Sequence, residues 1–110
     1  MKKIKLILVI AITLFAATSF AANKQTATIL VNGNCDMCKS RIETASKKAG
    51  ATNVFWNEKS HQLKLEFDAE KTSITKIEES ILKAGYDTEK LKATDKAYKS
   101  LPTCCQYERE

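Results

Sequence analysis

A strand pattern changes into a helix pattern at Val31-Asn32-Gly33-Asn34-Cys35-Asp36-Met37-Cys38. Before this stretch, residues 26–31 are rich in β-branched side chains and alternate loosely, which predicts a strand. From Cys38 onward, apolar residues recur at helical spacing until Gly50, which can end the helix. The stretch is therefore expected to be a loop between a strand and a helix, with Cys35 and Cys38 at the start of the helix.

The rest of the chain continues this alternation of strands and helices. Residues 52–56 and 63–67 predict two strands, which the polar loop 57–61 joins as a hairpin. Residues 73–84 predict a second helix that ends before Gly85, and residues 86–91 predict a short last strand. The order β-α-β-β-α-β is the split βαβ arrangement of ferredoxin-like folds. We therefore expect an α+β fold with an antiparallel four-stranded sheet and two helices on one face.

The first 21 residues are typical of a secretory signal. A basic start is followed by an apolar run from Leu6 to Ala17, and small residues precede a cleavage point after Ala21. An uncleaved membrane anchor is the alternative, although a spanning helix needs about 20 apolar residues. The sequence thus predicts a signal peptide (1–21), one small domain (22–92) and a C-terminal tail (93–110). After cleavage we expect a periplasmic or otherwise exported protein without stable membrane insertion.

Charge and composition argue against two classes of function. The chain has 18 basic and 13 acidic residues, and without Lys2, Lys3 and Lys5 its net charge falls from +5 to +2, which gives no support to nucleic-acid binding. No Ser-His-Asp set, catalytic carboxylate pair or phosphate-binding glycine loop is recognisable. The single histidine, His61, leaves little material for general base catalysis. We therefore expect that the protein is not an enzyme.

The pair Cys35 and Cys38 is the main candidate for chemistry. A thiolate binds soft metal ions and attacks disulfides, and a helix N-terminus lowers the pKa of a thiol beside it. Two thiolates on a loop suit an ion that accepts low coordination, such as Cu(I), whereas Zn²⁺ prefers four ligands. Because the cysteines of a partner can enter such an open site, the loop predicts metal transfer rather than storage.

A second pair of cysteines, Cys104 and Cys105, lies in the C-terminal tail after Pro102. The tail is expected to form a helical turn or two and then a mobile end. Its two sulfurs could fold back to complete a three- or four-sulfur site or act as a second metal station, but adjacent side chains of an extended segment point to opposite sides. Disulfide bonds are the alternative in an exported protein. Met37 offers a further soft sulfur, or simply covers apolar surface.

Together, these motifs resemble those of the heavy-metal-associated domain family, which includes copper chaperones and the periplasmic mercury-binding protein. The resemblance covers residues 26–91 and is carried by the loop 31–38, by Phe67-Asp68 and by Ala84-Gly85-Tyr86. It implies that Cys35 and Cys38 are exposed thiolate ligands, that Tyr86 packs near them, and that His61 lies at the edge away from them. One difference is that the family usually has Gly-Met-x-Cys, whereas this chain has Gly33-Asn34-Cys35 without the methionine.

The sequence therefore predicts an exported, monomeric protein that captures a soft ion between Cys35 and Cys38. It would pass the ion to a metal-transporting ATPase or another carrier. Cu(I) is the favoured ion, and Hg²⁺, Zn²⁺ and Cd²⁺ are the alternatives. Two other functions stay open: a thiol-disulfide oxidoreductase in which Cys35 attacks and Cys38 resolves, and a metal-free interaction module whose cysteines form a structural bridge.

Overall fold

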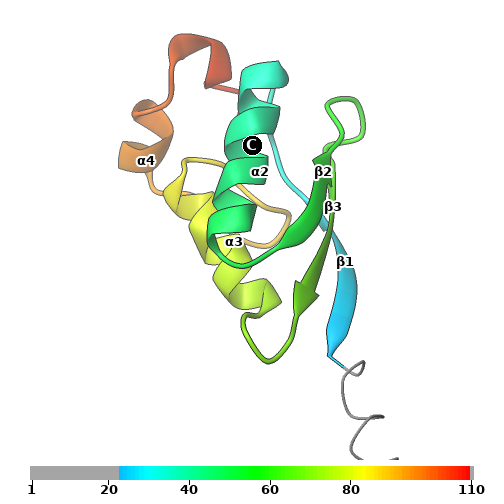
Figure 1. Ribbon diagram of the computed structural model, residues 1–110. Helices are drawn as coiled ribbons and strands as arrows, with labels where there is room; N and C mark the ends of the chain where they lie inside the picture. Colours follow the sequence, from blue (N-terminus) through cyan, green and yellow to red (C-terminus); the bar gives the residue numbers. More distant parts are fainter. Residues whose placement is uncertain (1–22, 110) are drawn as a thin grey trace, which may run out of the picture.

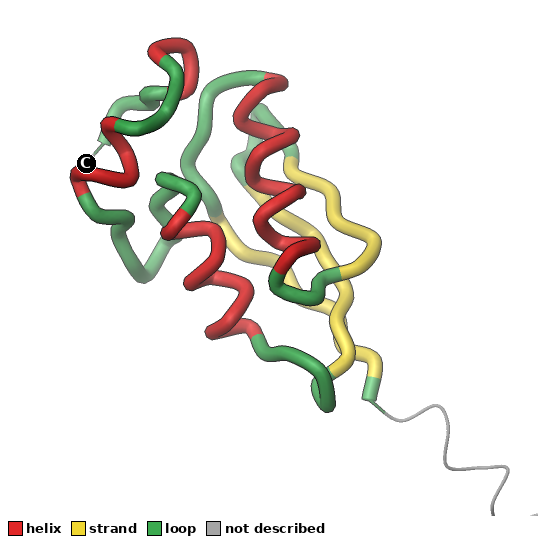
Figure 2. Tube along the Cα trace, turned by 60° about the vertical axis from the view of Figure 1, so that its left-hand side comes forward, coloured by secondary structure: helices red, strands yellow, loops and turns green. Residues whose placement is uncertain are grey.

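The computed structural model describes residues 23–109, so the predicted signal peptide lies outside the described residues. Within this part of the chain, an antiparallel sheet is covered on one face by two helices (Figure 1; Figure 2). The C-terminal segment lies beside these helices, at the end of the molecule where the first of them begins (Figure 1). Among residues 23–109, no helix combines the length and the apolar character needed to cross a membrane.

The sheet has three strands in the described residues: β1 (Lys24–Leu30), β2 (Thr52–Trp56) and β3 (Gln62–Asp68). They lie in the order β1-β3-β2 and all pairs are antiparallel, with Ile29 of β1 opposite Leu63 of β3. The apolar residues of β3 alternate with polar ones and are buried. One face of the sheet therefore supplies the core, as the alternation predicts.

The predicted fourth strand is wrong, because residues 86–91 add no strand to the sheet in the described part of the chain. Thr88 forms only an isolated bridge with Val31, just beyond the end of β1. The chain then turns back, since the Thr88 N–H donates to the Leu91 carbonyl at 2.9 Å and the Leu91 N–H donates to the Thr88 hydroxyl at 3.2 Å. A turn at this place ends the pairing with β1, so the α+β class holds with three strands instead of four.

Helices α2 (Asp36–Lys48) and α3 (Ile74–Lys83) cover the same face of the sheet (Figure 1; Figure 2). The Ser73 hydroxyl caps α3 by accepting a hydrogen bond from the Lys76 N–H at 3.2 Å. Each helix turns its apolar residues toward the core, as the predicted periodicity requires. The buried residues are Cys38, Ile42, Ala45 and Ser46 of α2 and Ile77 and Ile81 of α3.

The C-terminal segment, for which the sequence predicts a mobile end, packs against the domain instead. It forms α4 (Asp95–Lys99) and the 3-10 turn η1 (Thr103–Cys105). Leu101, Cys105 and Tyr107 are buried and belong to the same core cluster as the residues of the sheet and helices. The prediction failed because these apolar side chains are few and widely spaced within a polar segment.

The β2–β3 hairpin loop lies at the same end of the molecule as the start of α2 (Figure 1). The expectation that His61 lies away from the cysteines is therefore wrong. The reason is topological, because α2 runs away from the cysteine loop and β2 returns toward it. The His61 ring stacks on Trp56 with 5.7 Å between ring centroids, and the His61 carbonyl accepts a hydrogen bond from the Val31 N–H at 2.9 Å.

Candidate metal centre

Trp56 packs against the cysteine loop, residues 31–38, and helps to position it. Its indole N–H donates to the Val31 carbonyl at 3.0 Å, which fixes the chain where it leaves β1. A Cβ atom on Gly33 would lie 3.0 Å from the Trp56 ring and 3.2 Å from the Cys38 Cβ, so this close approach requires glycine. Cys35 is the N-cap residue of α2, and its sulfur makes no capping hydrogen bond. The loop is thus rigidly placed while the Cys35 sulfur takes no part in holding the helix.

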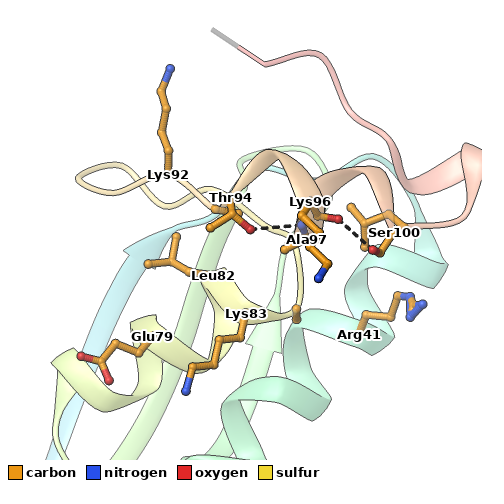
Figure 3. A pocket seen from close by; sticks show the side chains of 12 residues that line it. Arg41, Glu79, Leu82, Lys83, Lys92, Thr94, Lys96, Ala97 and Ser100 are labelled. Carbon is orange, nitrogen blue, oxygen red and sulfur yellow. Dashed lines mark hydrogen bonds between the residues drawn. The ribbon is translucent and has the colours of Figure 1, made fainter.

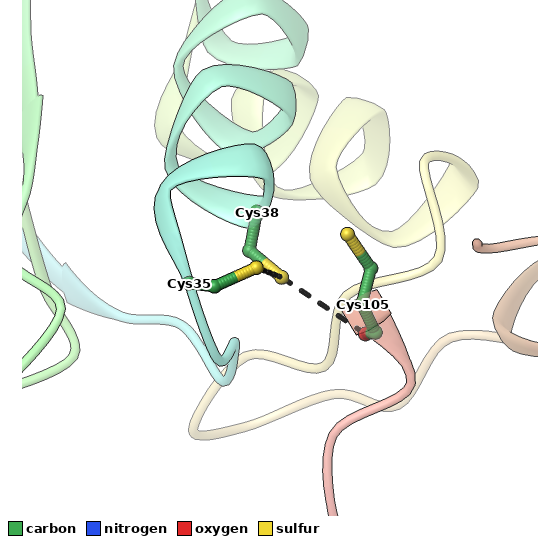
Figure 4. Close-up of side chains that lie close together, drawn as sticks. All are labelled: Cys35, Cys38 and Cys105. Carbon is green, nitrogen blue, oxygen red and sulfur yellow. Dashed lines mark hydrogen bonds between the residues drawn. The ribbon is translucent and has the colours of Figure 1, made fainter. Parts of the chain in front are cut away.

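Three thiols converge at the start of α2. The Sγ atoms of Cys35 and Cys38 are 3.9 Å apart, and those of Cys35, Cys38 and Cys105 all lie within 4.8 Å of one another (Figure 4). Cys35 is half-buried, whereas Cys38 and Cys105 are buried. All four cysteines of the chain are free thiols in the structure. Because thiolates are the preferred ligands of soft ions, this group of three, the thiol cluster, could hold a metal ion.

The thiols of the cluster differ in acidity. Burial acts to raise the pKa of Cys38, but hydrogen bonds from the backbone at Asn34 and Cys35 outweigh it, so the pKa lies below its ordinary value. Burial and the neighbouring Cys38 sulfur raise the pKa of Cys105 to about 12. Of these two thiols, Cys38 therefore ionises before Cys105.

Tyr86 faces the thiol cluster, where the sequence resemblance placed it. Its side chain is fully buried, and its hydroxyl has no hydrogen-bond partner among the described residues. Burial and the nearby sulfurs of Cys105 and Cys38 raise the pKa of the hydroxyl above its ordinary value, so it keeps its proton. A buried hydroxyl without a partner costs about 1–3 kcal/mol. A thiolate beside it would remove this cost by accepting its hydrogen bond.

Cys104 and Met37 lie outside the thiol cluster. The Cys104 sulfur is exposed and lies 3.7 Å from the Met37 sulfur, which is exposed as well. The Cys104 carbonyl faces the cysteine loop, where it accepts hydrogen bonds from the Asn34 amide at 3.4 Å and from the Cys35 thiol at 3.8 Å. The structure thus distinguishes the two tail cysteines, because Cys105 is buried in the cluster, whereas Cys104 stays exposed and contacts the cluster through its carbonyl and through its sulfur, which lies 3.9 Å from the Cys105 sulfur.

The C-terminal residues 101–109, here called the clasp, fix Cys105 in position. The Tyr107 hydroxyl donates to the Gly85 carbonyl at 2.9 Å and accepts from the Asp87 N–H at 2.8 Å. The Arg109 guanidinium donates to both oxygens of the buried Asp87 carboxylate, at 2.8 and 3.0 Å. These contacts are made with Gly85 and Asp87, the residues on either side of Tyr86, so the clasp and Tyr86 are held together.

The clasp was not predicted from the sequence. The available signal was the spacing of Cys105, Tyr107 and Arg109, since alternate residues of an extended segment share one side. Cys105 and Tyr107 are buried, whereas Gln106 between them and Cys104 before them are exposed. This alternation is visible in the sequence of the tail, although spacing alone does not identify its partners at residues 85–87.

A surface groove of about 610 Å³ lies among α2, α3 and α4 (Figure 3). Its lining combines apolar side chains with basic ones, among them Arg41, Lys83 and Lys96. No cysteine lines this groove. It is therefore separate from the thiol cluster, which lies in a packed region at the start of α2.

Comparisons with known proteins agree with this geometry. No protein-family model and no curated protein sequence matches the chain. Among solved structures, it is similar to oxidized MerP from Ralstonia metallidurans CH34, with 31% identity over 60% of this chain and 94% of that one and a TM-score of 0.56. The CopZ metallochaperone is 27% identical over 58% of this chain and 98% of its own, with a TM-score of 0.55. A putative copper-ion-binding protein from Bacillus anthracis str. Ames shares the fold, with 24% identity over 60% of this chain and 96% of that one and a TM-score of 0.56.

The chain has paired cysteines at the start of α2 and is similar to MerP over nearly the whole length of that protein. It therefore belongs to the heavy-metal-associated domain family of metal-binding proteins.

Proposed function

We propose that the protein is an exported carrier of a soft metal ion, which it binds through Cys35 and Cys38 and passes to another protein. The observation that carries the proposal is the pair of sulfurs 3.9 Å apart at the start of α2, one half-buried and one buried. Cu(I) is the favoured ion, with Hg²⁺, Zn²⁺ and Cd²⁺ as alternatives. The role is that of a carrier rather than an enzyme.

Capture of the ion rests on the chemistry of the thiols. Cys38 has a lowered pKa, so it offers a thiolate more readily than an ordinary cysteine does. The start of α2 adds the positive end of a helix dipole, which favours negative charge on the sulfurs. Sulfur ligands in a site with few donors favour soft ions over Mg²⁺ or Ca²⁺, which prefer oxygen.

Release of the ion rests on the unequal exposure of the two sulfurs. Cys35 is half-buried at the end of the loop, whereas Cys38 is buried against the core. An incoming thiolate can therefore reach the ion on the side of Cys35 and replace one ligand at a time. The similarity to a protein named as a metallochaperone supports such a transfer. The receiver would be a metal-transporting ATPase or another carrier, and the protein would act as a monomer.

The experiment uses the chain from Ala22 onward, which contains every residue of the core cluster. Native mass spectrometry of the reduced protein with Cu(I), Hg²⁺, Zn²⁺ and Cd²⁺ is expected to show one bound soft ion. Cys35→Ser and Cys38→Ser should each bind it far more weakly than the wild type, while Cys104→Ser, the matched control at an exposed cysteine, should keep the wild-type affinity. Mixing the Cu(I)-loaded protein with the isolated metal-binding domain of a copper-transporting ATPase should move the ion to that domain.

Other outcomes would contradict the proposal. If the reduced protein takes up none of the four ions but catalyses the reduction of insulin disulfides, the pair acts in thiol-disulfide exchange. If the ion binds but is never passed on, the protein stores metal instead of carrying it. Export has a separate test, because mass spectrometry of the periplasmic fraction should detect a chain that begins at Ala22.

A further inference from the structure

We propose that Cys105 is a third ligand, which the clasp delivers to Cys35 and Cys38 to form a three-coordinate thiolate site. The inference rests on the proposed function for the first two ligands and adds a donor from the far end of the chain. A loop with two cysteines would leave the ion open on one side. The clasp closes that side with a sulfur.

The spacing of the sulfurs fits a trigonal arrangement. Metal–sulfur bonds of about 2.3 Å place the sulfurs about 4.0 Å apart in a trigonal plane and about 4.6 Å apart in a linear arrangement. The Cys35 and Cys38 sulfurs are 3.9 Å apart, and the Cys105 sulfur lies within 4.8 Å of both. The pair is therefore already closer than a linear two-sulfur site requires, and the third sulfur lies at a distance from which it can bind.

The Tyr86 hydroxyl gives independent support. It is buried, without a hydrogen-bond partner among residues 23–109, and it faces the sulfurs of Cys105 and Cys38. Three thiolates around one ion leave a negative charge that needs hydrogen-bond donors. Tyr86 supplies such a donor, because its hydroxyl lies beside the sulfurs of both Cys105 and Cys38.

The position of Cys105 is built into the fold rather than left to a free tail. Tyr107 and Arg109 hold the clasp to residues 85–87 through four hydrogen bonds, and the rings of Tyr107 and Tyr86 are stacked with centroids 5.9 Å apart. Cys105 itself is fully buried, whereas its neighbour Cys104 is exposed. The segment thus selects one of two adjacent cysteines for the interior.

Binding balances as an exchange of protons for the ion. Each thiol that is still protonated releases its proton to water as its sulfur bonds to the metal, and no electron is transferred. Release to a partner reverses this exchange, with Cys105 protonated again as the partner's thiolate takes its place. The clasp therefore sets how tightly the ion is held as well as how it leaves.

The test compares Cys105→Ser with Cys104→Ser, its sequence neighbour, in the reduced chain from Ala22 onward. Cu(I) is added with a phosphine reductant and no added thiol, so every sulfur donor comes from the protein. X-ray absorption should count three sulfur neighbours in the wild type and in Cys104→Ser, and two in Cys105→Ser. Competition with a chromophoric Cu(I) chelator should show at least about tenfold weaker binding for Cys105→Ser, because loss of supporting groups alone costs 10–100-fold.

A second variant tests the clasp without removing a sulfur. Tyr107→Phe deletes the hydroxyl that contacts Gly85 and Asp87 and should weaken Cu(I) binding in the wild-type background but not in Cys105→Ser. Circular dichroism checks that each variant is folded. Should Cys105→Ser not fold, the sulfur counts of the wild type and Cys104→Ser decide by themselves.

The outcomes separate the two proposals. Two sulfur neighbours in the wild type, or equal affinities for Cys105→Ser and the wild type, would overturn the role of Cys105 and leave the carrier function intact. Equal weakening by Tyr107→Phe in both backgrounds would overturn the role of the clasp. Failure of the wild type to bind Cu(I) or Hg²⁺ at all would instead refute the proposed function.

Discussion

Replacement of Asp87 by asparagine should loosen the clasp and destabilise the metal-free protein. The Asp87 side chain is 3% exposed, and its carboxylate accepts hydrogen bonds from the Ala93 N–H at 2.8 Å and from two nitrogens of Arg109. Asparagine keeps one acceptor oxygen but loses the charge and turns an amide group toward the guanidinium. A charge-assisted hydrogen bond contributes about 1.5–3 kcal/mol, and removal of one partner of a fully buried ion pair costs about 3–5 kcal/mol.

Arg109 keeps 18% of its side-chain surface in water, so solvent offsets part of this cost. We therefore expect Asp87→Asn to lower the free energy of unfolding by about 2–3 kcal/mol. Urea unfolding of the reduced, metal-free chain, followed by circular dichroism, measures this value. Asp95→Asn is the matched control, because Asp95 also pairs with Arg109 at 2.9 Å but is 86% exposed. Its loss should stay below about 1 kcal/mol.

The pH dependence provides a second check on the same pair. Burial acts to raise the pKa of Asp87, but hydrogen bonds from Arg109 and from the Ala93 N–H outweigh it, so the pKa lies below its usual value of 3.8. The stabilisation is therefore present above the unfolded-state pKa and disappears as the pH falls through the lower, folded-state pKa. The Asp87→Asn variant should lack this decrease in the free energy of unfolding at low pH. Equal losses for the Asp87 and Asp95 variants, or identical acid profiles for Asp87→Asn and the wild type, would refute the reasoning.

Three further predictions concern the framework around the site. Gly85→Ala should lower the free energy of unfolding by more than about 1 kcal/mol in urea, because Gly85 has φ +106° and a Cβ there would lie 2.8 Å from the Ala97 carbonyl. Trp56→Phe should cost about 1–3 kcal/mol in the same assay, because it leaves the buried Val31 carbonyl without the indole donor. A chain that ends at Ser100 lacks the clasp, and calorimetry should show a melting temperature at least about 10 °C lower; an unchanged value would mean that the clasp does not pack in solution.

The sequence was sufficient for the two long helices, for strands β1, β2 and β3, and for the first two candidate ligands. Alternation in β3 and helical spacing in α2 and α3 predict the buried faces correctly, because both patterns are local and each repeats several times. The placement of Cys35 and Cys38 at the start of α2 follows from the same local signals. The resemblance to heavy-metal-associated domains added the expectation that Tyr86 lies near them.

The remaining features depend on contacts between distant parts of the chain. Residues 86–91 were predicted to be a strand, but the turn closed by Thr88 and Leu91 is stabilised by polar groups that leave no periodic signal. Cys105 reaches the cysteine loop only because Tyr107 and Arg109 contact residues about 20 positions earlier. Such pairings cannot be read from spacing, so the sequence could place Cys104 and Cys105 in the tail without deciding which one turns inward.

The position of Trp56 has a practical consequence. It is the only tryptophan of the chain, and its ring lies directly under the cysteine loop, against Gly33 and close to Cys38. The tryptophan fluorescence of the protein therefore comes from one ring near the cysteine sulfurs, and a heavy ion bound there should quench it. Tryptophan fluorescence would therefore report binding at the proposed site, so arrival and departure of the ion could be followed in real time without any attached dye.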